Sequence, residues 1–163
     1  MKANPTPEHE WLMQMVGEWT SRSTCQMPDG STNTSEGRET VRAVGEVWVV
    51  GEGETVIEGA RVTSVITLGY DPAMGRYVGS WIGSPMTTFV SYEGVRAASG
   101  ALPLDCTAPD LEDPTKRSAY QDIIEIRGPD ERAMISQIQN ADGTWTLFME
   151  AVYRRVRQPL TSC

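Results

Sequence analysis

The sequence predicts an all-β protein, a closed antiparallel up-and-down β-barrel of about ten strands with one short N-terminal α-helix covering one end. The chain contains 15 Gly and 10 Pro, which favours many turns over long helices. From residue 18 onward, short segments rich in β-branched and aromatic residues alternate with turn sequences such as Pro28–Ser31 and Asn140–Gly143. Barrel closure would remove exposed strand edges, although a two-sheet sandwich is an alternative that periodicity leaves open.

The helix is predicted over residues 7–16. Thr6 can cap free backbone amides, Pro7 suits the first helical position, and the acidic residues that follow suit the positive end of the helix dipole. Gly17 is expected to end the helix. One face of this helix is apolar at helical spacing, and it consists of Trp11, Leu12, Met15 and Val16.

The strands are predicted at residues 18–27, 35–44, 46–55, 61–70, 76–83, 86–93, 101–107, 118–127, 132–139 and 144–155. Alternation within a strand assigns side chains to the inner or outer face of the barrel. The inner face is expected to contain Val62, Ser64, Ile66, Leu68 and Tyr70; Met86, Thr88, Val90 and Tyr92; Met134, Ser136 and Ile138; Tyr120, Asp122, Ile124 and Ile126; and Trp48, Val50 and Glu52. The Pro- and acid-rich stretch 109–114 is expected to be one long loop, either a solvated connection or a lid over the barrel opening.

Composition limits the classes of function. A chain of 163 residues fits a single domain over 1–163. Its net charge of −8 argues against nucleic acid and anionic membranes as partners. No signal peptide or membrane-spanning apolar run is visible, so we expect a cytoplasmic protein. Three scattered cysteines and one histidine, His9, which we expect on the solvated surface, favour neither a metal site nor a cofactor.

A resemblance to a known family rests on motifs spread along the chain. These are Val16-Gly17-Glu18-Trp19, Trp48-Val49-Val50-Gly51-Glu52-Gly53, Leu68-Gly69-Tyr70-Asp71-Pro72, the Gly79–Ser84 segment, Tyr92-Glu93-Gly94, Tyr120–Ile126 and Asp142-Gly143-Thr144-Trp145. In this order they resemble the bacterial domain-of-unknown-function family 1579. The resemblance implies a lipocalin-like, calycin-type barrel and no assigned reaction, ligand or catalytic residue. Gln121 stands where the family pattern has Arg, and no extra Trp occurs in Phe89–Tyr92, which weakens the case for one shared ligand.

Three functions are consistent with the sequence. The first is a barrel that binds a small apolar or aromatic molecule, with aromatic side chains giving contact area and polar groups orienting the ligand. The second is a cofactor-free acid/base enzyme, such as an isomerase, cyclase or hydrolase, using Glu52 or Asp122, unless Arg38 and Arg42 simply neutralise a carboxylate. The third is a homodimeric interaction module that uses exposed strands or the Trp11 and Trp19 region. The candidate ligand-binding residues are Trp48, Glu52, Ser64, Thr88, Tyr92, Tyr120 and Asp122.

Overall fold

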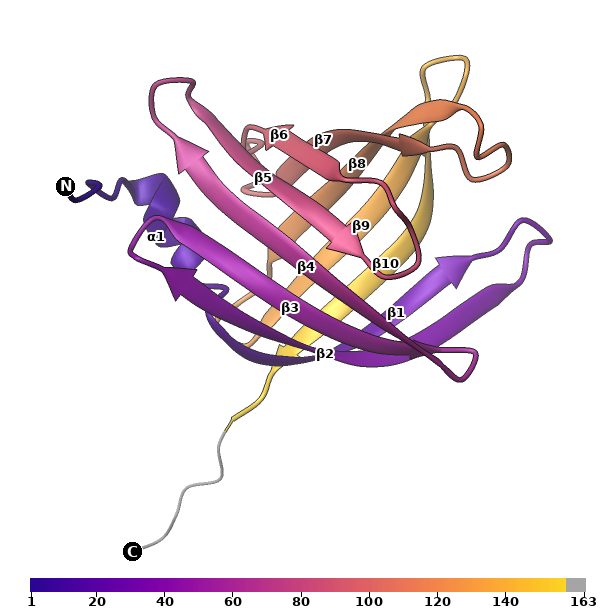
Figure 1. Ribbon diagram of the computed structural model, residues 1–163, viewed down its shortest axis with the longest axis horizontal. Helices are drawn as coiled ribbons and strands as arrows, with labels where there is room; N and C mark the ends of the chain where they lie inside the picture. Colours follow the sequence, from indigo (N-terminus) through magenta and orange to yellow (C-terminus); the bar gives the residue numbers. More distant parts are fainter. Residues whose placement is uncertain (158–163) are drawn as a thin grey trace, which may run out of the picture.

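The computed structural model describes residues 1–157, which form one closed antiparallel barrel preceded by a short helix (Figure 1). Each strand pairs with its neighbours in the chain, and β1 pairs with β10 to close the barrel, so the sandwich alternative is excluded. Residues 158–163 of the predicted domain lie outside the described residues. The elements are α1 (Pro7–Met13), β1 (Gly17–Gln26), β2 (Thr32–Val44), β3 (Trp48–Ile57), β4 (Ala60–Asp71), β5 (Arg76–Gly83), β6 (Val90–Gly94), β7 (Leu102–Pro109), β8 (Arg117–Ile126), β9 (Glu131–Gln139) and β10 (Trp145–Arg155).

Three predicted elements differ from the structure by three residues or more at one end, and one of them is the predicted strand 35–44, which begins at Thr32. The helix ends at Met13 because the next residues form tighter turns, with the Met15 and Val16 amides donating to carbonyls three residues back. The predicted strand 86–93 begins only at Val90. Pro85 has no amide to donate to a ladder, and the Met86 amide donates to the Gly83 carbonyl in a turn.

The helix is docked on β4 by His9. The Nδ1 atom of His9 accepts a hydrogen bond from the Thr6 amide at 2.9 Å, and Nε2 donates to the Tyr70 carbonyl, also at 2.9 Å. These contacts leave His9 only 3 % exposed, so the expectation of a solvated surface histidine is wrong. Within residues 1–157, no helix is long and apolar enough to span a membrane.

Apolar side chains fill the end of the barrel that α1 covers, which we call the closed end. Leu12 is fully buried there, which contributes about 1.5–3 kcal/mol relative to an exposed side chain. The Trp19 indole packs in the same cluster and donates to the Met15 carbonyl at 2.9 Å. Trp11 and Trp19 are both buried within the chain and belong to this core, and the homodimer considered from the sequence stays a prediction.

Arg155 ties the closed end together. Its guanidinium donates to the carbonyls of Gln14, Val16 and Pro129 at 2.7–2.9 Å and lies over the Trp19 ring. Gly17 is required beside it, because its φ of 140° disfavours any side chain and an added Cβ would collide with the Arg155 guanidinium. This contact joins the helix exit, β1 and the turn between β8 and β9.

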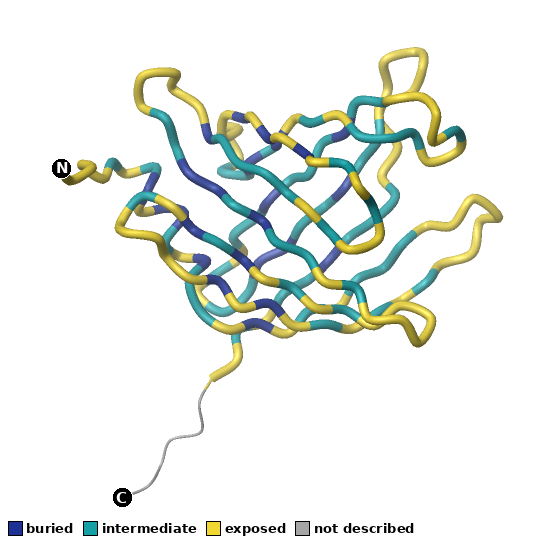
Figure 2. Tube along the Cα trace, viewed as in Figure 1, coloured by how far each residue is buried: buried dark blue, intermediate teal, exposed yellow. Residues whose placement is uncertain are grey.

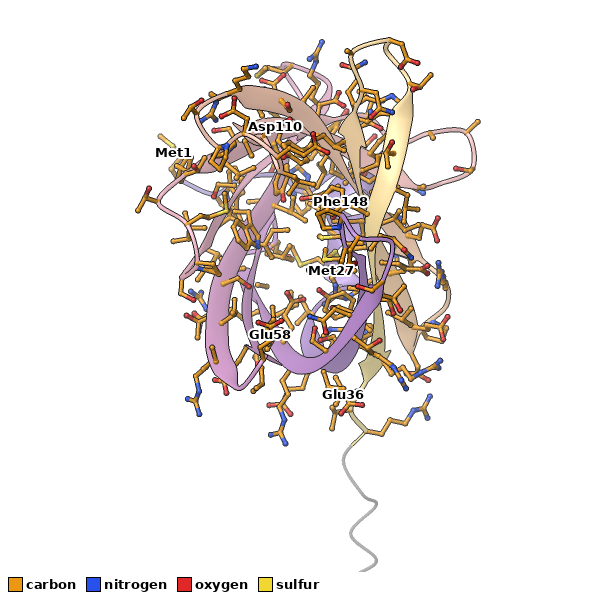
Figure 3. The ribbon with its side chains drawn as sticks, turned by 90° about the vertical axis from the view of Figure 1, so that its right-hand side faces the viewer. Met1, Met27, Glu36, Glu58, Asp110 and Phe148 are labelled. Carbon is orange, nitrogen blue, oxygen red and sulfur yellow. The ribbon has the colours of Figure 1, made fainter. Side chains whose placement is uncertain are left out.

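Burial falls from the closed end towards the opposite end, which we call the open end (Figure 2). Near the helix, the inward side chains of Val41, Val49 and Leu68 are buried. Further along the same barrel wall, inward side chains such as Ser23 and Ser35 remain partly exposed. Figure 3 looks into the open end, where Met27 and Phe148 lie beside each other at the rim. Solvent therefore reaches the inner face from the open end.

Candidate ligand-binding site

The inner face of the barrel consists of two chemically different walls. Strand alternation and cross-strand register determine which side chains share this face. Towards the open end, the inward residues of β1 to β4 are mostly small or polar, and they include Ser21, Ser23, Asn33, Ser35, Gly37, Gly53, Thr55 and Ser64. Nearer α1, the same strands turn Val41, Val49, Ile66 and Leu68 inward. The wall from β5 to β10 is aromatic, aliphatic and sulfur-containing, and it contains Trp81, Val90, Tyr92, Leu104, Cys106, Tyr120, Ile124, Met134 and Met149. Such an interior suits a molecule with an apolar side and a polar side.

Asp122 is the centre of a hydrogen-bonded group on the apolar wall. The Tyr92 hydroxyl donates to its Oδ2, and the Ser136 hydroxyl donates to its Oδ1 at 2.6 Å. Ser136 lies directly opposite Asp122 in the β8–β9 pair, and Tyr92 reaches it from β6. Burial raises the pKa of Asp122, and the two hydrogen bonds act in the opposite direction. Burial and the nearby Asp122 carboxylate hold the pKa of Tyr92 well above its usual value.

A buried ion pair spans the interior nearer the closed end. Arg132 on β9 crosses beneath β10 and β1 to pair with Glu39 on β2. Its guanidinium carbon lies 4.6 Å from the Trp19 ring centroid and 4.0 Å from that of Tyr153, so two aromatic faces cover the cation. Gly51 leaves room for the acid, since an added Cβ there would lie 3.2 Å from the Glu39 carboxylate. The two charges neutralise each other.

The other ionisable groups of the interior are held in their neutral forms. Burial raises the pKa of the Cys106 thiol to about 12, and Asp122 and Asp105 add to the effect. Burial also raises the pKa values of Cys25 and Tyr153. A thiolate nucleophile is therefore disfavoured at both cysteines. Among residues 1–157, no three His, Cys, Asp or Glu side chains are grouped so that they could hold a metal ion.

The structure places two predicted site residues on the outside of the barrel. Trp48 is 41 % exposed and Glu52 is also exposed, because β3 turns Val49, Gly51 and Gly53 inward instead. The prediction of their orientation is wrong because two of the inward residues are glycines, which give no hydropathy signal. The Trp48 ring covers Gly69 on the outer face of β4, where an added Cβ would collide with it.

The remaining predicted residues lie on or near the inner face. Ser64 is partly buried on β4, and Thr88 is partly buried in the loop before β6. Tyr92 and Asp122 are hydrogen-bonded to each other. The Tyr120 ring is buried, and its hydroxyl donates to the Pro109 carbonyl at 2.6 Å. The structure thus brings Tyr92 and Asp122 together, and Tyr120 instead fixes the start of the 110–116 loop.

Sequence reasoning missed Glu39 and Arg132. Arg132 precedes Met134 and Ser136 by two and four residues, so strict alternation would have put it on the same inner face. Glu39 precedes the buried Val41 by two residues in the same way. Arg and Glu are usually solvated, so a single sequence gives no sign that these two pair inside the barrel. In the structure they form the buried ion pair described above, and the Arg132 Nε has no hydrogen-bond partner among the described residues.

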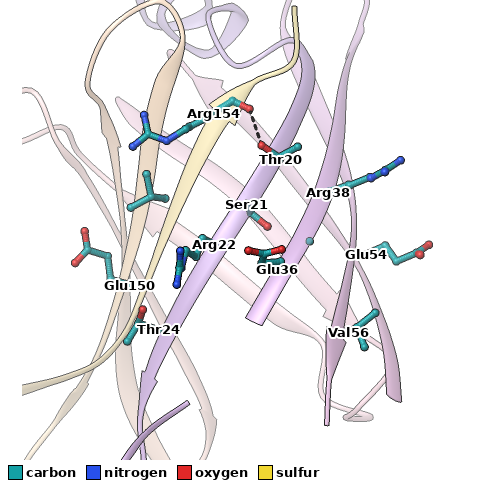
Figure 4. A pocket seen from close by; sticks show the side chains of 12 residues that line it. Thr20, Ser21, Arg22, Thr24, Glu36, Arg38, Glu54, Val56, Glu150 and Arg154 are labelled. Atoms are coloured by element: carbon teal, nitrogen blue, oxygen red, sulfur yellow. Dashed lines mark hydrogen bonds between the residues drawn. The ribbon is translucent and has the colours of Figure 1, made fainter. Parts of the chain in front are cut away.

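Of the grooves on the described part of the chain, two border the open end or the strands that close the barrel. One, of about 600 Å³, lies at the rim of the open end between the β1–β2 turn, the 110–116 loop and the β9–β10 hairpin, and its lining includes Met27, Leu111 and Phe148. The other, of about 710 Å³, crosses the outer face of β10, β1, β2 and β3 (Figure 4). Its lining carries both signs of charge, with Arg22, Arg38, Arg154, Glu36, Glu54 and Glu150.

Comparisons with known proteins agree with this architecture. The structure resembles the protein Rv2717c from M. tuberculosis with a TM-score of 0.68 at 17 % identity, covering 94 % of this chain and 100 % of that one. It also resembles the S-type phycobiliprotein lyase CPES from Guillardia theta with a TM-score of 0.64 at 14 % identity, covering 93 % of this chain and 94 % of that one. At these identities the likeness concerns the fold alone. No curated protein matches the sequence.

A family model described as a protein of unknown function, DUF1579, matches residues 4–155. This match spans α1 and all ten strands. It agrees with the resemblance drawn from the Trp, Gly and Tyr motifs. The chain therefore belongs to the DUF1579 family.

Proposed function

We propose that the barrel interior binds a small molecule with an apolar or aromatic body. The observation that carries this proposal is the change in burial along the inner face. The closed end is filled by residues such as Leu12 and Leu68, whereas Ser23, Ser35 and Trp81 nearer the open end are inward-facing and partly exposed. A barrel that served only as a folded core would bury these side chains as well.

The open end offers a route for the ligand. Met27 and Leu111 are 39 % and 56 % exposed at its rim, and Phe148 makes an edge-to-face contact with Tyr120 just inside. Exposed apolar side chains around an opening favour the entry of apolar molecules. Asp110 shapes this rim, because its carboxylate accepts hydrogen bonds from the Glu112 and Asp113 amides and from the Ser118 hydroxyl.

The proposal is tested by titrating the protein with Nile red, an uncharged apolar dye that fluoresces more strongly in apolar surroundings. The wild type should bind the dye with a saturable fluorescence increase. Ser35→Trp fills the interior from β2 and should weaken binding by about tenfold or more, because one tenfold change needs only about 1.4 kcal/mol.

Thr34→Trp is the matched control, since Thr34 is the neighbouring outward residue on the same strand. This variant should bind the dye within about twofold of the wild type. Equal weakening by both substitutions, or no saturable binding to the wild type, would refute interior binding.

One observation favours a second candidate function, acid/base catalysis on a bound substrate. Asp122 is inward-facing, its pKa is raised by burial, and it is hydrogen-bonded to the Tyr92 hydroxyl, which is an arrangement that can move a proton. Glu52 no longer supports this function because it faces solvent. The test is to incubate the protein with a metabolite extract and measure consumption by mass spectrometry. A compound consumed by the wild type but not by Asp122→Asn would establish catalysis. If no such compound is found, catalysis is refuted and ligand binding remains the proposed function.

A further inference from the structure

The charges inside the barrel do not sum to zero. Glu39 and Arg132 neutralise each other, and their side chains are 10 % and 2 % exposed. Asp122 lies on the same inner face, and within the described residues 1–157 it makes no salt bridge. Its surroundings supply two hydroxyl donors and no cation. The neutral thiols and phenols described above add no further charge.

Asp122 can still accept hydrogen bonds. A carboxylate offers about four lone-pair positions, and Tyr92 and Ser136 occupy one on each oxygen. Tyr92 and Ser136 are buried, and burial also desolvates the inward Asp122 carboxylate, so in this proposal a ligand in the barrel meets that carboxylate through the lone pairs that the two hydroxyls leave free. Cys106, on the neighbouring strand β7, is also partly exposed and lines the approach.

We propose that the ligand carries a cationic nitrogen, such as an amine, that binds the Asp122 carboxylate while its apolar body contacts the aromatic wall. This inference rests on the proposed interior binding. Folding has already removed the Asp122 carboxylate from most of its water, so the desolvation of this carboxylate does not count against ligand binding. A cationic ligand is attracted to the carboxylate and supplies its missing counter-charge. An anionic ligand would be repelled by Asp122, and the inward-facing cations are already paired, Arg132 with Glu39 and Arg155 with Asp130.

The inference is tested by competition against Nile red at pH 7.5 with dodecylamine and dodecanoate, which share a chain and differ in the sign of the head-group charge. Both are used below the concentrations at which they form micelles. Dodecylamine should displace the dye at a concentration at least about tenfold lower than dodecanoate. Equal displacement, or a preference for dodecanoate, would overturn the inference while leaving interior binding intact.

Two variants assign the preference to Asp122. Asp122→Asn keeps the shape and removes the charge, so the amine preference should fall to within about threefold. Glu52→Gln is the matched control, because it removes an equal charge from the outer face and should leave the preference unchanged. If Glu52→Gln reduces the preference as much as Asp122→Asn, the effect comes from net charge and the inference fails. If Nile red does not bind at all, interior binding fails and this inference fails with it.

Discussion

The buried pair formed by Glu39 and Arg132 gives the sharpest prediction about stability. Arg132→Met should destabilise the protein by about 3–5 kcal/mol, because it leaves the Glu39 carboxylate buried without a partner. The same change removes the contacts of the guanidinium with the Trp19 and Tyr153 rings, each worth about 0.5–2 kcal/mol. Urea unfolding at pH 7, followed by tryptophan fluorescence, measures the loss.

A double-mutant cycle separates the pair from its surroundings. Glu39→Met combined with Arg132→Met removes both charges, so it should restore most of the lost stability and lie within about 2 kcal/mol of the wild type. The surface pair of Arg154 with Glu131 is the control, since Arg154 is 71 % exposed and Arg154→Met should cost less than about 1 kcal/mol. A loss below about 1 kcal/mol for Arg132→Met would refute the reasoning.

Three further predictions follow from burial. The pKa of Asp122 is higher in the folded protein than in the unfolded chain, so the protein should lose stability as the pH rises from about 3.8 through the folded pKa. Urea unfolding measured across this pH range should show the loss in the wild type but not in Asp122→Asn. The raised pKa of Tyr92 predicts a similar loss of stability as the pH rises above about 10, and this loss should be smaller in Tyr92→Phe than in the wild type. Equal losses in the wild type and Tyr92→Phe would contradict the prediction. Leu12→Ala should destabilise the protein by about 2–5 kcal/mol in urea, whereas a cost under 1 kcal/mol would mean that α1 does not seal the closed end.

Most of the fold could be predicted from the sequence because turn chemistry and alternation act locally. Turns such as Pro28–Ser31 and Asn140–Gly143 lie where expected, and the strand bounds agree within a few residues except at β2 and β6. The ends of short elements are harder, since tight turns after Met13 and the missing amide of Pro85 depend on details that periodicity does not show.

The site was less predictable because its orientation depends on one residue of register. On β3 the inward positions include Gly51 and Gly53, so the stripe of Trp48 and Glu52 looked like the inner face. On β8 the inward residues are large and apolar around Asp122, and the alternation assigned it correctly to the inside. Pairings across the barrel, such as Glu39 with Arg132, join residues far apart in the chain, and a single sequence does not reveal them.

The most direct test of the central claim is a crystal structure of the protein grown with Nile red. Interior binding predicts electron density for the dye inside the barrel, between Trp81 and Tyr92 on one wall and Ser23 and Ser35 on the other. Dye bound only in the outer groove of Figure 4, with the interior closed by side chains, would contradict the account.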